Sequence, residues 1–123
     1  MANTKKILVV DDDSSVLQML TRALTAYDLT IARDGAEALL LAGRTPNLDL
    51  VITDYLMPEM TGDELIARMR EQRPHLKALV ITGHSDLLDR EGPEWWQAEE
   101  HLAKPFRLKA LRDKVELLLA SSF

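Results

Sequence analysis

Ile7-Leu8-Val9-Val10-Asp11-Asp12-Asp13 is the stretch that decides the fold, because four apolar residues lead directly into three carboxylates. A short apolar run rich in β-branched residues is typical of a strand buried on both faces, as in a parallel sheet. Two further runs, residues 48–52 and residues 78–81, are nearly as apolar. Two weaker runs occupy residues 29–32 and 101–103. The sequence therefore predicts five short strands.

Segments with helical spacing separate these strands. Asp13 and Ser14 suit the N-cap of the first helix, whose apolar stripe runs to Tyr27. Three more segments have helical character: residues 36–42, 61–69 and 108–119. Because strands alternate with helices, we expect a single α/β domain over residues 1–123, with a parallel sheet, helices on both faces and right-handed crossovers.

One segment, residues 85–99, departs from this regular pattern. Gly92-Pro93 interrupts it, so we expect a short, broken or displaced helix there. Trp95-Trp96 lies in the same segment, and adjacent side chains on a helix point about 100° apart. We therefore favour one packed and one half-exposed tryptophan over the alternative, an exposed aromatic anchor for a partner.

Length, charge and composition exclude several functions. A chain of 123 residues is the size of one domain, and it holds no cysteine, so disulfides, thiolate metal sites and thiol nucleophiles are excluded. The net charge of −5 argues against direct nucleic-acid binding, which needs a basic surface. The apolar run at 7–10 is too short for a signal peptide or a membrane span. We expect a soluble cytoplasmic protein with no membrane partner.

Polar side chains follow the predicted strands, and ligands of open α/β sheets bind beyond the carboxyl ends of the strands. These side chains are Asp11, Asp12, Asp54, Thr82 and Lys104. Three carboxylates at one rim raise each other's pKa unless a cation compensates their charge. Since every candidate ligand atom is an oxygen, the cation is expected to be hard, Mg²⁺ or Mn²⁺. A carboxylate beside such a cation can attack phosphorus and become an aspartyl phosphate.

Four segments in this order resemble the response-regulator receiver domains of two-component signalling. They are Ile7–Asp13, Ile52–Pro58, Ile81–Gly83 and Ala103–Phe106. The resemblance covers essentially the whole chain. It implies a flavodoxin-like fold, with a five-stranded parallel sheet in the order 2-1-3-4-5 and helices on both faces.

The resemblance also implies a role for each polar residue at the strand ends. Asp54 becomes the phosphoacceptor, and Thr82 and Lys104 contact the phosphoryl group. The implied Mg²⁺ ligands are Asp11, Asp12, Asp54 and the backbone carbonyl of Leu56. The implied donor is a sensor histidine kinase or a histidine phosphotransfer protein. The chain would then be a phosphoprotein that catalyses only its own phosphorylation and dephosphorylation, and not a metabolic enzyme.

Phosphorylation in this family switches binding to a downstream protein through the face of the fourth helix, fifth strand and fifth helix. We expect a monomer or a weak dimer. The basic start of the last helix, which holds Arg107, Lys109, Arg112 and Lys114, is either a solvated face or part of a docking surface.

Three features depart from the family pattern. His101 stands where a tyrosine or phenylalanine often lies three residues before the lysine, so the usual aromatic readout is in doubt. Residues 86–99 lack the usual small-residue approach to the fifth strand. The chain ends at Ser121-Ser122-Phe123, so we expect no output domain after the last helix.

Three alternatives stay open at this point. In a haloacid-dehalogenase-type phosphatase, Asp11 would be the nucleophile and Asp13 the acid/base, although strand four lacks the acidic pair such enzymes use. The chain can also be a binding module that keeps the fold without phosphorylation. Finally, it can be a receiver taken from a hybrid kinase or from a DNA-binding regulator.

Overall fold

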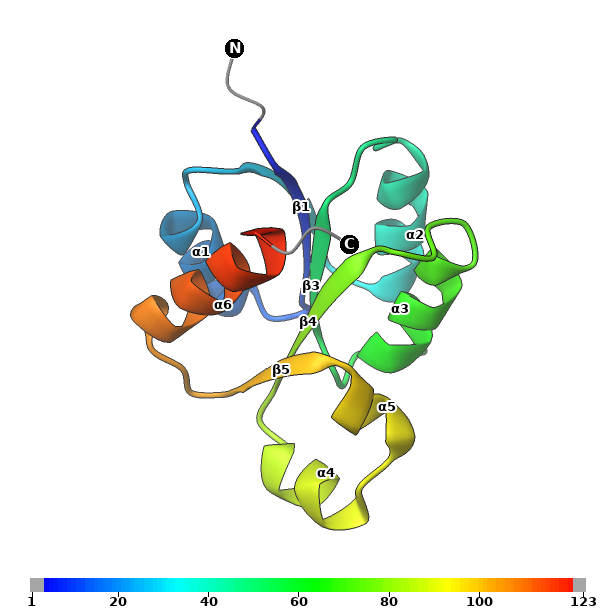
Figure 1. The fold of residues 1–123 in the computed structure, drawn as a ribbon, viewed down its shortest axis with the longest axis vertical. Helices are drawn as coiled ribbons and strands as arrows, with labels where there is room; N and C mark the ends of the chain where they lie inside the picture. Colours follow the sequence, from blue (N-terminus) through cyan, green and yellow to red (C-terminus); the bar gives the residue numbers. More distant parts are fainter. Residues whose placement is uncertain (1–3, 121–123) are drawn as a thin grey trace.

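The computed structural model describes residues 4–120 of the chain (Figure 1). Met1–Asn3 and Ser121–Phe123 lie outside the described residues, and the expectations about the two ends of the chain fall on them. Among residues 4–120, no helix is long and apolar enough to cross a membrane.

A five-stranded sheet in the order β2-β1-β3-β4-β5 forms the centre of the molecule, and every neighbouring pair is parallel. The strands are β1 Lys6–Val10, β2 Asp28–Ala32, β3 Leu50–Asp54, β4 Lys77–Thr82 and β5 Glu100–Ala103. The predicted fold class and strand order are confirmed. The third strand begins two residues later than the apolar run 48–52 and ends at Asp54, because its ladder with β4 runs from Leu50 to Asp54.

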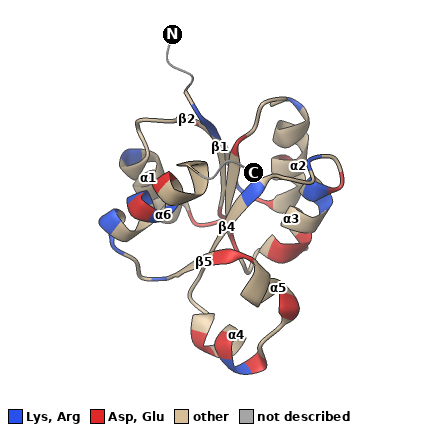
Figure 2. Cartoon of the chain, in the orientation of Figure 1, with Lys and Arg blue, Asp and Glu red and all other residues tan. Residues whose placement is uncertain are grey.

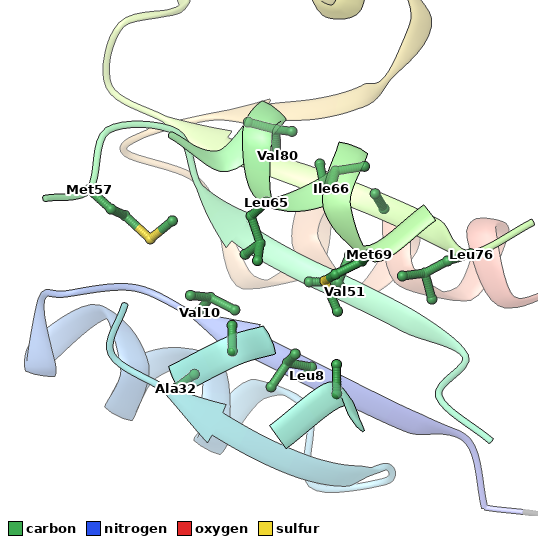
Figure 3. Close-up of a cluster of buried hydrophobic side chains, with 13 residues drawn as sticks. Leu8, Val10, Ala32, Val51, Met57, Leu65, Ile66, Met69, Leu76 and Val80 are labelled. Carbon is green, nitrogen blue, oxygen red and sulfur yellow. The ribbon is translucent and has the colours of Figure 1, made fainter. Parts of the chain in front are cut away.

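Helices cover both faces of the sheet (Figure 1). They are α1 Ser14–Ala23, α2 Gly35–Gly43, α3 Gly62–Arg70, α4 Ser85–Glu91, α5 Glu94–Ala98 and α6 Leu108–Ala120. Alternate residues of each strand face opposite layers, as strand geometry requires. In β1, Leu8 and Val10 pack towards α2 and α3 (Figure 3), whereas Ile7 and Val9 pack towards α1 and α6.

The irregular segment is divided into two short helices, as the sequence predicts. Gly92 ends α4 in the left-handed conformation, with φ of 59° and ψ of 42°, which glycine adopts without steric cost. Pro93 is the N-cap of α5. Trp96 is 3% exposed and Trp95 is half-buried, so the favoured arrangement of the two tryptophans is confirmed. The helix expected as the fifth is therefore α6.

Candidate functional site

Strand register brings the predicted site residues together at one rim of the sheet. Val10 pairs with Thr53, so the next residues, Asp11 and Asp54, lie side by side where β1 and β3 end. Thr82 pairs with Ala103, and Lys104 follows directly. All five predicted polar residues thus lie at the carboxyl ends of the neighbouring strands β1, β3, β4 and β5.

Asp11, Asp12 and Asp54 form a tight carboxylate cluster. Each offers one oxygen, and these oxygens lie within 4.8 Å of one another. Asp11 is 1% exposed, Asp54 is 9% exposed, and Asp12 faces solvent. The backbone N–H of Asp13 donates to Asp11 Oδ1 at 2.9 Å, which fixes the orientation of the Asp11 carboxylate.

Asp13 itself takes no part in the cluster. Its Oδ1 accepts hydrogen bonds from the backbone N–H of Ser15 at 2.9 Å and from the Ser15 hydroxyl at 2.7 Å. These bonds make it the N-cap of α1, which is the role that an aspartate before a helix commonly has. They also lower the pKa of the Asp13 carboxyl. An acid/base role for Asp13, as the phosphatase alternative requires, finds no support in this arrangement.

Lys104 joins the two buried carboxylates of the cluster. Its Nζ lies 3.1 Å from Asp11 Oδ2 and 3.3 Å from Asp54 Oδ1. Burial alone would lower the pKa of this ammonium group, but the charges of Asp54 and Asp11 outweigh burial and raise the pKa. Lys104 therefore stays charged at neutral pH and partly neutralises the cluster.

One cation does not fully compensate the buried carboxylates. Burial, followed by the charge of Asp11, raises the pKa of Asp54 from the model-compound value of 3.8 to about 6, although Lys104 and the N–H of Tyr55 oppose the rise. Burial also raises the pKa of Asp11, against the N–H of Asp13 and the charge of Lys104. Both shifts show that the cluster holds more negative charge than its surroundings stabilise.

Thr82 lies fully buried at the end of β4, beside the cluster. Its Oγ1 accepts a hydrogen bond from the backbone N–H of His84 at 2.9 Å, which leaves the hydroxyl proton available as a donor. The backbone N–H of Lys104 donates to the Thr82 carbonyl at 2.8 Å, so these two residues are held in a fixed relation. The Lys104–Pro105 peptide bond is cis.

Gly62 is a residue of the site that the sequence analysis missed. Its N–H donates to the Tyr55 carbonyl at 2.8 Å, which draws the start of α3 against the end of β3. A Cβ at this position would lie 2.4 Å from the Asp54 carbonyl oxygen, closer than atoms can approach. In the sequence, Gly62 is simply a glycine after Thr61. Its close approach to Asp54 depends on tertiary structure, which no local pattern shows.

Leu56, the implied source of a backbone ligand, lies in the loop that follows β3. Its side chain is exposed, whereas the next residue, Met57, is buried in the core and anchors the loop (Figure 3). The role of the Leu56 carbonyl stays a prediction.

The donor set fits a hard divalent cation. Three carboxylates converge, two of them have raised pKa values, and among residues 4–120 no histidine or cysteine joins the cluster. Mg²⁺ prefers such oxygen ligands and keeps waters or phosphate oxygens at its other positions. The fold and the site together define a class of protein: a doubly wound α/β domain whose acidic rim suits a cation and a phosphoryl group.

Comparison with known proteins gives the family. A model described as the response regulator receiver domain matches residues 7–116. Response regulator MprA of Mycobacterium sp. (strain KMS) is 37% identical over 117 residues, which are 93% of this chain and 50% of that protein. The alkaline phosphatase synthesis transcriptional regulatory protein PhoP of Bacillus subtilis (strain 168) is 32% identical over 120 residues, or 96% of this chain and 50% of PhoP. The chain thus spans about half the length of these curated relatives.

Solved structures agree with this result. The signal receiver domain of an HD domain-containing protein from Pseudomonas fluorescens Pf-5 is 31% identical, with a TM-score of 0.84, and the match covers 98% of this chain and 90% of that one. The chemotaxis protein CheY4 of Vibrio cholerae is 30% identical, with a TM-score of 0.83, over 95% of this chain and 100% of CheY4. The chain belongs to the response regulator receiver domains of two-component systems.

Proposed function

We propose that Asp54 accepts a phosphoryl group from a phosphohistidine, with Mg²⁺ bound at the carboxylate cluster, and that phosphorylation switches the binding of a downstream protein. The donor is a sensor histidine kinase or a histidine phosphotransfer protein. A cytoplasmic location, which the absence of cysteine favours, is part of the proposal. The observation that carries it is the convergence of Asp54 with Asp11, Asp12 and Lys104 at one strand-end rim.

The chain's own residues supply the nucleophile and its activation. With a pKa of about 6, Asp54 is mostly ionised at pH 7 and presents an oxygen to the phosphorus. As the new O–P bond forms, the P–N bond to the donor imidazole breaks, and its electron pair stays on the imidazole nitrogen. Asp11, Asp12, Asp54 and the Leu56 carbonyl would hold Mg²⁺, which would supply charge neutralisation for the phosphoryl oxygens.

Lys104 and Thr82 respond to the new group. Phosphorylation replaces one carboxylate charge by about −1.5 to −2 charges with three acceptor oxygens. Lys104 already lies 3.3 Å from Asp54 and can pair with one phosphoryl oxygen, and the Thr82 hydroxyl can donate to another. Hydrolysis then restores the carboxylate, so the chain catalyses only its own phosphorylation and dephosphorylation.

The output is a shift between two conformations of the face formed by α4, β5 and α6. A change of population from 1:99 to 99:1 takes about 5.5 kcal/mol of differential interaction. Three acidic residues outnumber the one basic residue of α4, and Glu94 is the charged residue of α5, whereas basic residues lie at the start of α6 (Figure 2). Direct binding of nucleic acid is not part of the proposal, and we expect a monomer or weak dimer.

Chemical phosphorylation tests the proposal. Incubation with Mg²⁺ and acetyl phosphate should add one hydroxylamine-labile phosphate, detected by intact mass spectrometry, and peptide mapping should place it at Asp54. The Asp54→Asn variant should remain unmodified, and Asp86→Asn, an exposed aspartate on α4, is the matched control that should label normally.

Two outcomes would contradict this function. If Asp54→Asn were labelled to the same extent as wild type, Asp54 would not be the phosphoacceptor. Turnover of p-nitrophenyl phosphate that survives the loss of Asp54 would instead favour the phosphatase alternative, with Asp11 as the nucleophile.

A further inference from the structure

Four aromatic rings form an unbroken series of ring contacts, here called the aromatic stack, between the site and β5. Tyr55 stacks on Trp95 with ring centroids 5.0 Å apart and an interplanar angle of 28°. Trp95 meets Trp96 edge-on at 5.7 Å and 82°. Trp96 stacks on His101 at 3.5 Å and 12°. The stack therefore links the residue after Asp54 with the histidine that occupies the family's aromatic position.

The first ring of the stack belongs to Tyr55, the residue that follows the phosphoacceptor. The backbone N–H of Tyr55 donates to Asp54 Oδ1 at 2.9 Å. The same oxygen lies 3.3 Å from Lys104 Nζ. A phosphoryl group that draws Lys104 away from Asp54 Oδ1 changes the surroundings of the oxygen on which the Tyr55 backbone is held.

The other end of the stack holds α4 and α5 in place. Trp96 is the buried residue of α5, and its indole N–H donates to Asp89 Oδ1 of α4 at 2.8 Å. In α4 only Leu88 is buried, and Leu87 is 44% exposed. In Figure 1 the two helices lie together at the lower end of the molecule, apart from the other helices. Leu88, Trp95 and Trp96 therefore attach the two helices to the rest of the molecule, together with Glu99 at the end of α5, which pairs with Arg70 of α3.

His101 packs directly against α5. Its ring stacks on Trp96, and burial, followed by the nearby charge of Lys114, lowers its pKa, which favours the neutral ring. A rearrangement that separates His101 from Trp96 breaks a ring contact with the same residue that bonds Asp89 of α4. In this chain, the fifth-strand position and the α4–α5 pair form one unit.

We propose that Trp95 is the positioning residue that couples the phosphorylation state of Asp54 to the position of α4 and α5, through its contacts with Tyr55 and Trp96. This inference rests on the proposed function. Spatial continuity alone does not establish coupling, which must be measured as the response of one end to a change at the other. Removal of the ring at position 95 should leave phosphorylation possible and strongly reduce the response of the helices.

Hydrogen exchange measured by mass spectrometry tests this coupling. Wild-type protein, with Mg²⁺ and with or without acetyl phosphate, should show a several-fold change in amide exchange rates within residues 85–99 on phosphorylation. In Trp95→Leu, this change should fall at least threefold at an equal labelled fraction of Asp54, measured by intact mass on the same samples. Trp95→Phe keeps an aromatic ring and should restore the response. Leu87→Ala, on α4 but outside the stack, should retain it.

A second variant covers the case in which Trp95→Leu does not fold. Tyr55→Leu removes the other ring of the same contact but keeps the backbone N–H, and its response, normalised to the labelled fraction, should fall similarly. Three outcomes would overturn the coupling and leave the proposed function intact. The first is a response equal to that of wild type in a labelled Trp95→Leu or Tyr55→Leu variant. The others are an equal loss of response in Trp95→Phe, and a labelled wild type that shows no change in exchange within residues 85–99. A wild type that acetyl phosphate cannot label would overturn the proposed function itself.

Discussion

At the scale of single residues, the site combines buried carboxylates with one lysine that only partly compensates their charge. Lys104 lies between Asp11 and Asp54, yet both carboxyls keep raised pKa values. A buried carboxylate that is not fully compensated destabilises the native state. The protein therefore retains Asp54 at a cost in stability, and this cost has a measurable dependence on pH.

The Asp54→Asn variant should reveal that cost. With a native pKa of about 6, ionised Asp54 destabilises the metal-free native state by about 1–3 kcal/mol at pH 7, relative to an unshifted carboxyl. Asparagine carries no charge, and Lys104 keeps its partner Asp11, so the variant should have the higher free energy of unfolding at pH 7 without Mg²⁺. Between pH 6 and pH 4 Asp54 binds more of a proton in the native state than in the unfolded chain, so its destabilising contribution decreases as pH falls and the difference from the variant should shrink. Urea titrations in EDTA at several pH values measure it.

A pH-independent difference would mean that Asp54 keeps an ordinary pKa in the native protein. Asp86→Asn, which changes an exposed aspartate, is the control for a general effect of charge and should differ little from wild type at any pH.

At the scale of elements, the site depends on how tightly one helix approaches one strand. The start of α3 contacts the end of β3 through Gly62, whose N–H donates to Tyr55 and whose α-carbon faces the Asp54 carbonyl. Side chains at this junction would push α3 away from the phosphoacceptor. Packing of helix on sheet thus sets the geometry of the loop that holds Leu56.

Two glycine-to-alanine substitutions test this junction. Gly62→Ala places a Cβ 2.4 Å from backbone atoms that cannot easily move, so we expect a loss of about 1–3 kcal/mol in the free energy of unfolding and slower labelling of Asp54. Gly43→Ala, at the end of α2, meets nothing within 4 Å and should be neutral or stabilising by up to about 1 kcal/mol. Chemical denaturation and acetyl phosphate labelling measure both. Equal stability of the two variants would contradict the close approach at Gly62.

At the scale of the whole molecule, the sequence predicted those parts of the fold and site that a local pattern of residues determines. The polar residues of the site follow apolar runs directly, so their convergence could be inferred from parallel-sheet topology alone. The bounds of β3 were predicted less well, because Asp49 lies before the ladder, where its carboxylate accepts a hydrogen bond from the Lys6 N–H at 2.8 Å. Contacts such as Tyr55 with Trp95 join residues far apart in the chain, and no local pattern encodes them.

Metal binding should stabilise the whole domain, because a ligand that binds only the native state adds to its stability. At a free Mg²⁺ concentration 100 times the Kd, the gain in the free energy of unfolding should be about 2.7 kcal/mol. Asp12 is exposed, so Asp12→Asn should fold normally, and a tenfold weaker affinity would reduce the gain to about 1.4 kcal/mol at the same concentration. Asp28→Asn, at the opposite end of the sheet, should keep the full gain.

Thermal melts with added Mg²⁺ or EDTA measure these gains. A gain for Asp12→Asn equal to that of wild type would show that Asp12 contributes nothing to the cation site.

The aromatic stack also gives the protein an optical property of its own. The chain contains two tryptophans, and both belong to the stack, at adjacent positions of α5. Intrinsic fluorescence excited at the indole band therefore originates from a single short helix. A stopped-flow trace of this emission after mixing with a phosphodonor would report when α5 responds, in real time and without an attached dye.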